Sequence, residues 1–329
     1  MPELRRDPVT ERWVIISEER RGRPSEYRPT EEFAPLAHCP FCPGQESETP
    51  PTLLSTQGAT GWQTRVFANR YPALRVEARS GITSTELYGH SDGLGAHEVM
   101  VESPLHSDDY ASMDAAALLA VLTGWQARMR DLAQDQRLAH ATIFKNAGAQ
   151  SGATLSHPHS QLIATPIVPP AVLDRLDGSA RFWRRTGHCV YCAMAEEAES
   201  SGARLVWSDA QAVVFCPYAP RVGFECIVSP RQHESRFEFA SEAMLAGVAG
   251  AMSRLFGALR EALPRVSYHL SIQTAPLRSA ASASDHWYLE VLPVLSRHAA
   301  FEMASGMNIV STAPETAAAY LRERLTRAA

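Results

Sequence analysis

Two histidines that flank a proline are the residues best placed by type and spacing to do chemistry. His157 and His159 are separated by Pro158, and Ser160 and Gln161 follow directly. Proline disfavours helix at the residue before it, and alternate residues of an extended chain face the same side. The two imidazoles can therefore reach one site as nucleophile, metal ligand or general base. For the motif alone, two solvated or core histidines are the alternative.

The composition is that of an ordinary globular protein, with 329 residues, 45% of them hydrophobic, and a formal net charge of -5. This length suits one large domain or two modest ones. Without a basic excess, nucleic-acid binding has no electrostatic support. We see no apolar run that could be a signal peptide or a membrane span. We therefore expect a cytoplasmic protein with no nucleic-acid partner and no membrane partner.

Four of the six cysteines form two Cys-x-x-Cys pairs. In a cytoplasmic chain such pairs indicate metal sites first and redox pairs second. Cys216 and Cys226 lie in apolar, strand-like runs, so we expect them in the core. The two pairs are Cys39 with Cys42, and Cys189 with Cys192.

The second half of the sequence repeats segments of the first half in the same order. We read two copies of one unit that contains strands and a long helix. The predicted domains are residues 1–168, which hold the two histidines, and residues 169–329. The matches pair 66–67 with 212–215, 96–106 with 223–233, a helix from Ser112 to about 135 with one over about 241–263, and 157–161 with 285–290.

The repeat also selects candidate metal ligands, because each copy offers Cys-x-x-Cys, a histidine after Ser-Pro, and a histidine at the last strand. Two thiolates and two imidazoles make a closed tetrahedral site for a structural zinc ion. We therefore expect two structural zinc sites per chain, although His38 and His188 could compete as ligands. The sets are Cys39, Cys42, His106 and His157, then Cys189, Cys192, His233 and His286.

One asymmetry between the copies indicates a nucleophile. His159 has no histidine counterpart, because Tyr288 stands at that position in the second copy. Zinc would occupy His157 and leave His159 free to attack phosphorus.

The loop from Ala147 to Thr154 is rich in small residues, which permit close approach to a ligand. The arginines around Arg20 and Arg23 could hold a phosphate or form a solvated turn.

These residues together resemble the galactose-1-phosphate uridylyltransferase branch of the histidine-triad superfamily. The resemblance covers nearly the whole chain. It rests on the His157–Gln161 motif, the Cys-x-x-Cys pairs and three further segments, at 4–9, 103–106 and 144–146. It implies an α+β fold of two tandem histidine-triad-like units, whose antiparallel sheets form half-barrels flanked by helices. It also implies a homodimer.

The resemblance further implies roles for individual residues. His159 becomes nucleotidylated, and Gln161 hydrogen-bonds the transferred phosphoryl group. Asn69 matches a position near the nucleoside, and Ser160, which replaces a common glycine of the motif, is counted among the substrate-binding positions. The positions that match diphosphate contacts are Arg20, Arg23, Asn146, Gly152 and Thr154.

We expect a double displacement in which His159 takes a nucleotidyl group from a nucleotide sugar and passes it to a sugar 1-phosphate or phosphate. The first interpretation is transfer of UMP between a UDP-hexose and a hexose 1-phosphate. The intact second Cys-x-x-Cys and the tail at 301–306 resemble the sister group that includes ADP-glucose phosphorylase, so adenylyl transfer to phosphate is the alternative. A nucleotide-sugar hydrolase and a non-catalytic zinc module are the remaining readings.

Overall fold

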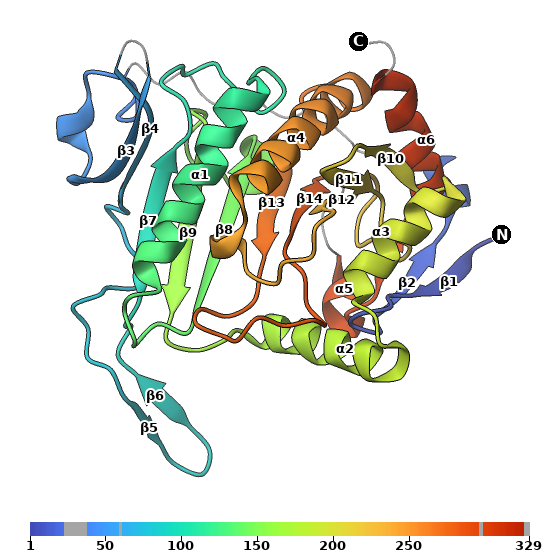
Figure 1. The fold of residues 1–329 in the computed structure, drawn as a ribbon, viewed down its shortest axis with the longest axis horizontal. Helices are drawn as coiled ribbons and strands as arrows, with labels where there is room; N and C mark the ends of the chain where they lie inside the picture. The colour runs from blue at the N-terminus through green and yellow to red at the C-terminus, as the bar shows by residue number, and fades with distance from the viewer. Residues whose placement is uncertain (23–37, 59–60, 296–298, 326–329) are drawn as a thin grey trace.

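A ten-stranded antiparallel sheet forms the centre of the part of the chain that the computed structural model describes, residues 1–22, 38–58, 61–295 and 299–325 (Figure 1). Both halves of the sequence contribute five strands to it. In spatial order the strands are β10 (Leu205–Ser208), β11 (Ala212–Phe215), β12 (Cys226–Pro230), β14 (Tyr288–Pro293), β13 (Tyr268–Gln273), β8 (His140–Ala147), β9 (His159–Thr165), β7 (Ala96–Val101), β4 (Gly61–Ala68) and β3 (Thr52–Gly58).

The strand order confirms the predicted repeat. Counted outward from the centre, the first half runs β8, β9, β7, β4, β3 and the second runs β13, β14, β12, β11, β10. The halves meet where β8 pairs with β13, with Asn146 opposite His269. The two sheets therefore join edge to edge into one. The division at residues 168 and 169 stays a prediction.

Two long helices cover one face of this sheet and pack against each other (Figure 1). They are α1 (Ala115–Leu132) and α4 (Glu242–Ala262), the helices expected in each copy. The apolar stripe of α1 is buried, as its helical spacing predicts. Ser241 caps α4 by accepting a bond from the Met244 backbone. The first helix begins later than the predicted start at Ser112, because Asp114 is the cap that accepts the bond from the Ala117 backbone.

The remaining elements include a small second sheet and a helix, residues 190–201, whose Val190 and Tyr191 pack with Val213 and Ile227 on the face of the large sheet opposite its long helices. A small sheet joins sequence-distant segments, because β15 pairs in parallel with β2 and β2 pairs with β1. Among the described residues, no helix combines the length and apolar character that crossing a membrane requires. The bounds are β1 (Glu3–Arg6), β2 (Trp13–Ile16), β15 (Asn308–Val310), α2 (Pro170–Thr186), α3 (Val190–Ser201), α5 (Ala300–Ser305), α6 (Pro314–Leu325), and the 3-10 helices Glu18–Gly22, Glu46–Glu48, Ala149–Ser151 and Phe237–Phe239.

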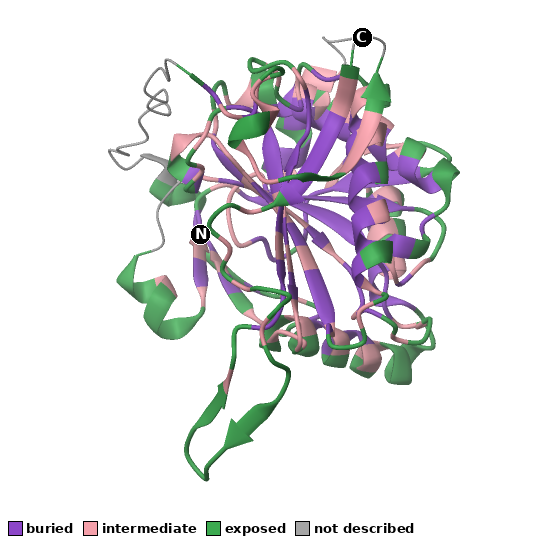
Figure 2. Cartoon of the chain, turned by 90° about the vertical axis from the view of Figure 1, so that its left-hand side faces the viewer, coloured by how far each residue is buried: buried purple, intermediate pink, exposed green. Residues whose placement is uncertain are grey.

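A β-hairpin projects from the body between β4 and β7 and is exposed along most of its length (Figure 2). It consists of β5 (Ile82–Ser84) and β6 (Gly89–Ser91). The Gly, Ser and Thr content of residues 79–96 predicts a loop, and the structure forms this short hairpin within it. The turn is closed by a bond from the Thr85 backbone N–H to the Tyr88 carbonyl, 2.8 Å long. Strands of three residues carry too little apolar alternation to be detected.

A buried charge network lies under the start of β9, on the face that α1 covers. The Lys145 ammonium is 2.5 Å from a carboxylate oxygen of Glu102 and donates to the His159 carbonyl at 3.1 Å. The Tyr110 hydroxyl donates to the other Glu102 oxygen at 2.5 Å. The Lys145 and Glu102 side chains are only 4% and 0% exposed, so each charge depends on the other.

Replacing Lys145 by Met should therefore destabilise the fold strongly. The change leaves the Glu102 charge buried without its partner, which costs about 3–5 kcal/mol in proteins. Urea unfolding at neutral pH measures the loss. Arg137→Ala is the control, because it breaks an exposed ion pair with Asp135 and should change the unfolding free energy little. The double variant Glu102→Gln/Lys145→Met should recover part of the loss, and equal losses in Lys145→Met and the control would contradict the prediction.

Candidate active site and metal centres

The side chain of His159, at the first position of β9, is held by a hydrogen bond through one of its two ring nitrogens. Its Nδ1 lies 2.8 Å from the His157 carbonyl oxygen. A carbonyl only accepts, so Nδ1 carries the proton and the lone pair lies on Nε2. Burial lowers the pKa of His159, and the nearby Lys145 charge acts in the same direction. The imidazole is therefore kept in the neutral form that a nucleophile requires.

His159 lines a cavity of about 560 Å³ on the side of the sheet opposite α1. Such a volume is typical of small-molecule sites. The Phe41 ring lies edge-on to the His159 ring, with centroids 5.4 Å apart. Two cavity residues, Arg70 and Tyr71, were not predicted as site residues. They follow Asn69 in the turn after β4, so their position in that turn was the available signal.

Gln161 lies two residues after His159 and lines the same cavity, as strand alternation requires. Its Oε1 is 2.7 Å from His97 Nε2 and 3.4 Å from Asn69 Nδ2. Asn69 also lines the cavity, at the end away from His159 along the strands. His97 was not predicted as a site residue. His97 lies two residues before Val99 and so faces the same side of the strand, and Val99 pairs with Gln161. This strand alternation was the signal that could have identified His97.

Ser160 is a wrong prediction as far as its side chain is concerned. Successive residues of a strand point to opposite faces, so Ser160 faces α1 while His159 and Gln161 face the cavity. Its buried hydroxyl accepts a bond from Trp125 Nε1 at 2.8 Å. The side chain therefore anchors β9 to α1.

The loop between β8 and β9 brings two of the other predicted residues towards His159. Thr154 lines the cavity. Gly152 has φ +83°, which favours glycine, and a Cβ there would meet nothing within 4 Å. Asn146 lies on β8, two residues beyond the residue that pairs with Gln161, and its Oδ1 is 2.9 Å from His269 Nδ1. It is not among the residues that line the cavity.

The predicted arginines are not brought to His159 by the described chain. Arg20 is exposed in the 3-10 helix Glu18–Gly22, which follows β2. That helix is tied to α6, because Thr316 Oγ1 donates to Glu18 at 3.0 Å. It therefore lies beside the second half, away from the cavity (Figure 1). Arg23 lies outside the described residues.

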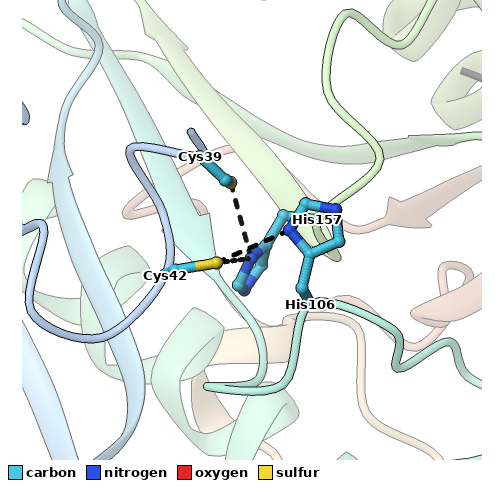
Figure 3. Close-up of side chains that lie close together, drawn as sticks. All are labelled: Cys39, Cys42, His106 and His157. Atoms are coloured by element: carbon cyan, nitrogen blue, oxygen red, sulfur yellow. Dashed lines mark hydrogen bonds between the residues drawn. The ribbon is translucent and has the colours of Figure 1, made fainter. Parts of the chain in front are cut away.

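The first metal cluster is assembled as predicted (Figure 3). Cys39 Sγ and Cys42 Sγ each lie 3.7 Å from His157 Nδ1, and Cys42 Sγ lies 3.5 Å from His106 Nδ1. Tetrahedral zinc with usual bond lengths would separate sulfur and nitrogen ligands by about 3.6 Å. The four donors therefore fit zinc in both type and spacing.

The outer nitrogens of both histidines are also held. His157 Nε2 donates to the Ser103 carbonyl, and His106 Nε2 bonds Ser156 Oγ, both at 2.8 Å. Such partners fix the ring and leave the other nitrogen as metal ligand. His38, the competing candidate, is 2.9 Å from Glu48 and is not one of the clustered groups.

The second cluster contains three of the four predicted ligands. Cys189, Cys192 and His233 lie together, with Cys192 Sγ 3.5 Å from His233 Nδ1. The ring of His286 lies near that of His233, with centroids 5.3 Å apart. However, His286 Nδ1 accepts the Glu234 backbone N–H at 3.4 Å, and its Nε2 donates to a carbonyl. His286 is therefore not one of the groups that the structure gathers within metal-ligand spacing, and its role as the fourth ligand stays a prediction.

Comparisons with known proteins agree with the fold and the site. The family model described as galactose-1-phosphate uridyl transferase, N-terminal domain, matches residues 1–169. ADP-glucose phosphorylase from Arabidopsis thaliana is 34% identical, over 98% of this chain and 93% of that protein. Galactose-1-phosphate uridylyltransferase from Thermotoga maritima is 27% identical, over 74% and 71%.

Solved structures give the same result. The crystal structure of the Arabidopsis thaliana ADP-glucose phosphorylase with bound ADP-glucose has a TM-score of 0.85 and 32% identity, with 98% of each chain covered. A uridylyltransferase structure has a TM-score of 0.79 and 25% identity, with 100% of this chain and 99% of that chain covered. The matched family model, the identity and the coverage lead to one conclusion: this chain belongs to the galactose-1-phosphate uridylyltransferase family.

Proposed function

We propose that this protein transfers the adenylyl group of ADP-glucose to inorganic phosphate through a covalent intermediate on His159. The observation that carries the proposal is the bond from His159 Nδ1–H to the His157 carbonyl, which leaves Nε2 as the nucleophile beside a cavity. The choice of ADP-glucose rests on similarity, since the Arabidopsis ADP-glucose phosphorylase matches at 34% identity over nearly the full length.

The reaction proceeds in two displacements. His159 Nε2 attacks the α-phosphorus of ADP-glucose, the bond to the bridging oxygen breaks, and glucose 1-phosphate leaves. Phosphate then attacks the adenylyl phosphorus, the bond to nitrogen breaks, and ADP forms. Hydrogen-bond donors around the transferring group stabilise its charge in both steps. Gln161 has an amide to offer, and Arg70 is a cavity-lining cation.

Uridylyl transfer between a UDP-hexose and a hexose 1-phosphate is the second candidate, although the sequence alone placed it first. The match to the Thermotoga uridylyltransferase supports it. The same His159 chemistry serves both reactions, so they differ only in the base and the acceptor. A hydrolase would release the nucleotide to water without an acceptor.

We further propose one structural zinc ion in each Cys/His cluster. Cys39, Cys42, His106 and His157 would hold the first, where the metal would tie the loop before β3 to the start of β9. Cys189, Cys192 and His233 would hold the second, and His286, whose ring lies 5.3 Å from that of His233, is the proposed fourth ligand. A homodimer and a cytoplasmic location remain predictions from the sequence and its resemblance.

Incubation with ADP-glucose, without phosphate, should add one adenylyl group to the protein. Intact-protein mass spectrometry detects the adduct, and UDP-glucose and UDP-galactose are run beside it. His159→Asn should give no adduct and lose turnover by several orders of magnitude, because the nucleophile is gone. Tyr288→Phe, at the equivalent position of β14, is the control that should keep the adduct.

The nucleotide sugar that forms the adduct, and the acceptor that removes it, distinguish the phosphorylase, the uridylyltransferase and the hydrolase. An adduct from ADP-glucose that phosphate converts to ADP supports the phosphorylase. An adduct only from uridine donors would replace it by uridylyl transfer. Nucleotide release in water alone would identify a hydrolase, and an adduct on the His159→Asn variant would contradict the assigned nucleophile.

Metal analysis should find about two zinc ions per chain, and about one after Cys42→Ser or Cys192→Ser. Each variant should also melt at a lower temperature, since binding of structural zinc contributes to folding. Folded protein with reduced zinc should still form the adduct, because His159 needs no metal for attack. Adduct formation that stops in folded, zinc-depleted protein and returns with any divalent metal would contradict a purely structural role.

A further inference from the structure

Two backbone N–H groups fix the side chains of His97 and Asn69 at the cavity end of β4 and β7. The Ala73 N–H donates to His97 Nδ1 at 3.1 Å. A neutral imidazole that accepts at Nδ1 carries its proton on Nε2. The Tyr71 N–H donates to Asn69 Oδ1 at 2.9 Å, so the Asn69 nitrogen must point the other way. Both side chains therefore present an N–H donor in a defined direction.

The His97 donor points at the Oε1 of Gln161, because Nε2 lies 2.7 Å from it. Asn69 Nδ2 lies between the two groups, 3.1 Å from His97 Nε2 and 3.4 Å from Gln161 Oε1. Because His97 Nε2 already carries a proton, Gln161 Oε1 is the acceptor that remains for Asn69. The Gln161 oxygen is thus directed to His97 and Asn69, and its amide nitrogen takes the opposite side of the group. In the part of the chain that the structure describes, no hydrogen bond from this nitrogen to the protein is found. Gln161 and His159 line the same cavity.

We propose that His97 and Asn69 are positioning residues that hold the Gln161 amide with its N–H groups towards the transferring phosphoryl group. The inference rests on the proposed nucleotidyl transfer. A glutamine amide can rotate by half a turn, and the rotated form would place its oxygen against the anionic phosphoryl oxygens. The close His97 donor, supported by the Asn69 amide beside it, disfavours that form, because the rotated amide would set its N–H groups against two other donors. The N–H groups of Gln161 are therefore oriented before the substrate binds.

The second half of the chain provides an internal comparison. There Ile227 pairs with Glu290 as Val99 pairs with Gln161, and Glu225 precedes Ile227 by two residues as His97 precedes Val99. The positions of His97 and Gln161 are therefore held by two carboxylates, Glu225 directly before β12 and Glu290 within β14.

Arg221 bridges these carboxylates, 3.2 Å from Glu225 and in direct contact with Glu290. Tyr288 replaces the nucleophile in this half. The imidazole–amide pair thus occurs in the half that has the nucleophile, and the repeated strand pairing forms without it. The pair is accordingly better explained by the chemistry than by the fold.

The test is the rate of adenylyl adduct formation from ADP-glucose in single and double variants. Gln161→Ala should slow the reaction about 10²–10³-fold, as loss of one oxyanion donor does. His97→Ala should slow it about 10-fold, the effect of roughly one hydrogen bond. If His97 acts through Gln161, the double variant should be no slower than Gln161→Ala alone.

Conservative and control variants separate positioning from general damage. His97→Gln keeps an N–H donor at a similar reach and should restore most of the rate. Gln161→Glu accepts from His97 but cannot donate, so it should be as slow as Gln161→Ala. Thr83→Ala, on the exposed hairpin, should leave the rate unchanged. Additive losses in the double variant, or no rescue by His97→Gln, would overturn the proposal.

A second readout stands apart from activity. Nitrogen-15 NMR of histidine-labelled protein, assigned with His97→Gln, reports which ring nitrogen carries the proton. We expect the Nε2–H form for His97, and the Nδ1–H form would overturn the proposal. If the unaltered protein forms no adduct with any donor, the proposed function fails, whereas the tautomer still decides the geometry of the Gln161 pair.

Discussion

The carbonyl oxygen of His157 is the point on which the site depends. It accepts the Nδ1 proton of His159 and so decides which nitrogen of that ring is free to attack. The ring of the same residue faces Cys39 and Cys42 through its Nδ1. One residue therefore couples a metal cluster to the nucleophile. Any movement of the cluster would move the carbonyl and with it the reactive nitrogen, which explains how a structural metal can matter to a reaction in which it takes no part.

Contacts on the α1 side of β9 fix the backbone of residues 159 and 160. Lys145 bonds the His159 carbonyl, and Glu102 balances the charge of Lys145 in a setting where neither is exposed. Ser160 ties the next residue to Trp125 of α1. These contacts use the alternation of the strand: one face is packed to fix the backbone, and the other carries His159 and Gln161 into the cavity. Burying a charge pair costs free energy of desolvation. Here the pair fixes the backbone of the nucleophile, because Lys145 holds the carbonyl of His159 itself.

The sequence predicts those parts of the structure that depend on local pattern or on repetition. The repeat located both long helices and the matching strands, and the spacing of cysteine and histidine found the complete first cluster. The other features depend on how strands and side chains pair in three dimensions, which the sequence alone does not show. Ser160 was wrongly predicted to bind substrate through its side chain, because the motif alone does not show which face of the strand each residue takes. His286 matches His157 in sequence, yet the Glu234 backbone takes its Nδ1. His97 belonged to a recognised strand, but its meeting with Gln161 depends on the register of β7 against β9.

Duplication of the unit explains how the two halves could diverge while the sheet stayed intact. Strand pairing is made by the backbone, so the cavity-facing positions of β9 and β14 were free to differ. In the first half they hold His159 and Gln161, neutral groups oriented by hydrogen bonds, His159 to the His157 carbonyl and Gln161 from His97. In the second half they hold Tyr288 and Glu290, and Arg221 closes the space between carboxylates. An ionised carboxylate is acceptor-only, so Glu290 offers a phosphate none of the N–H donors that the Gln161 amide provides. The second half thus keeps the shape of the unit without its reactivity, and one active site per chain follows from the charges at equivalent positions of one repeated sheet.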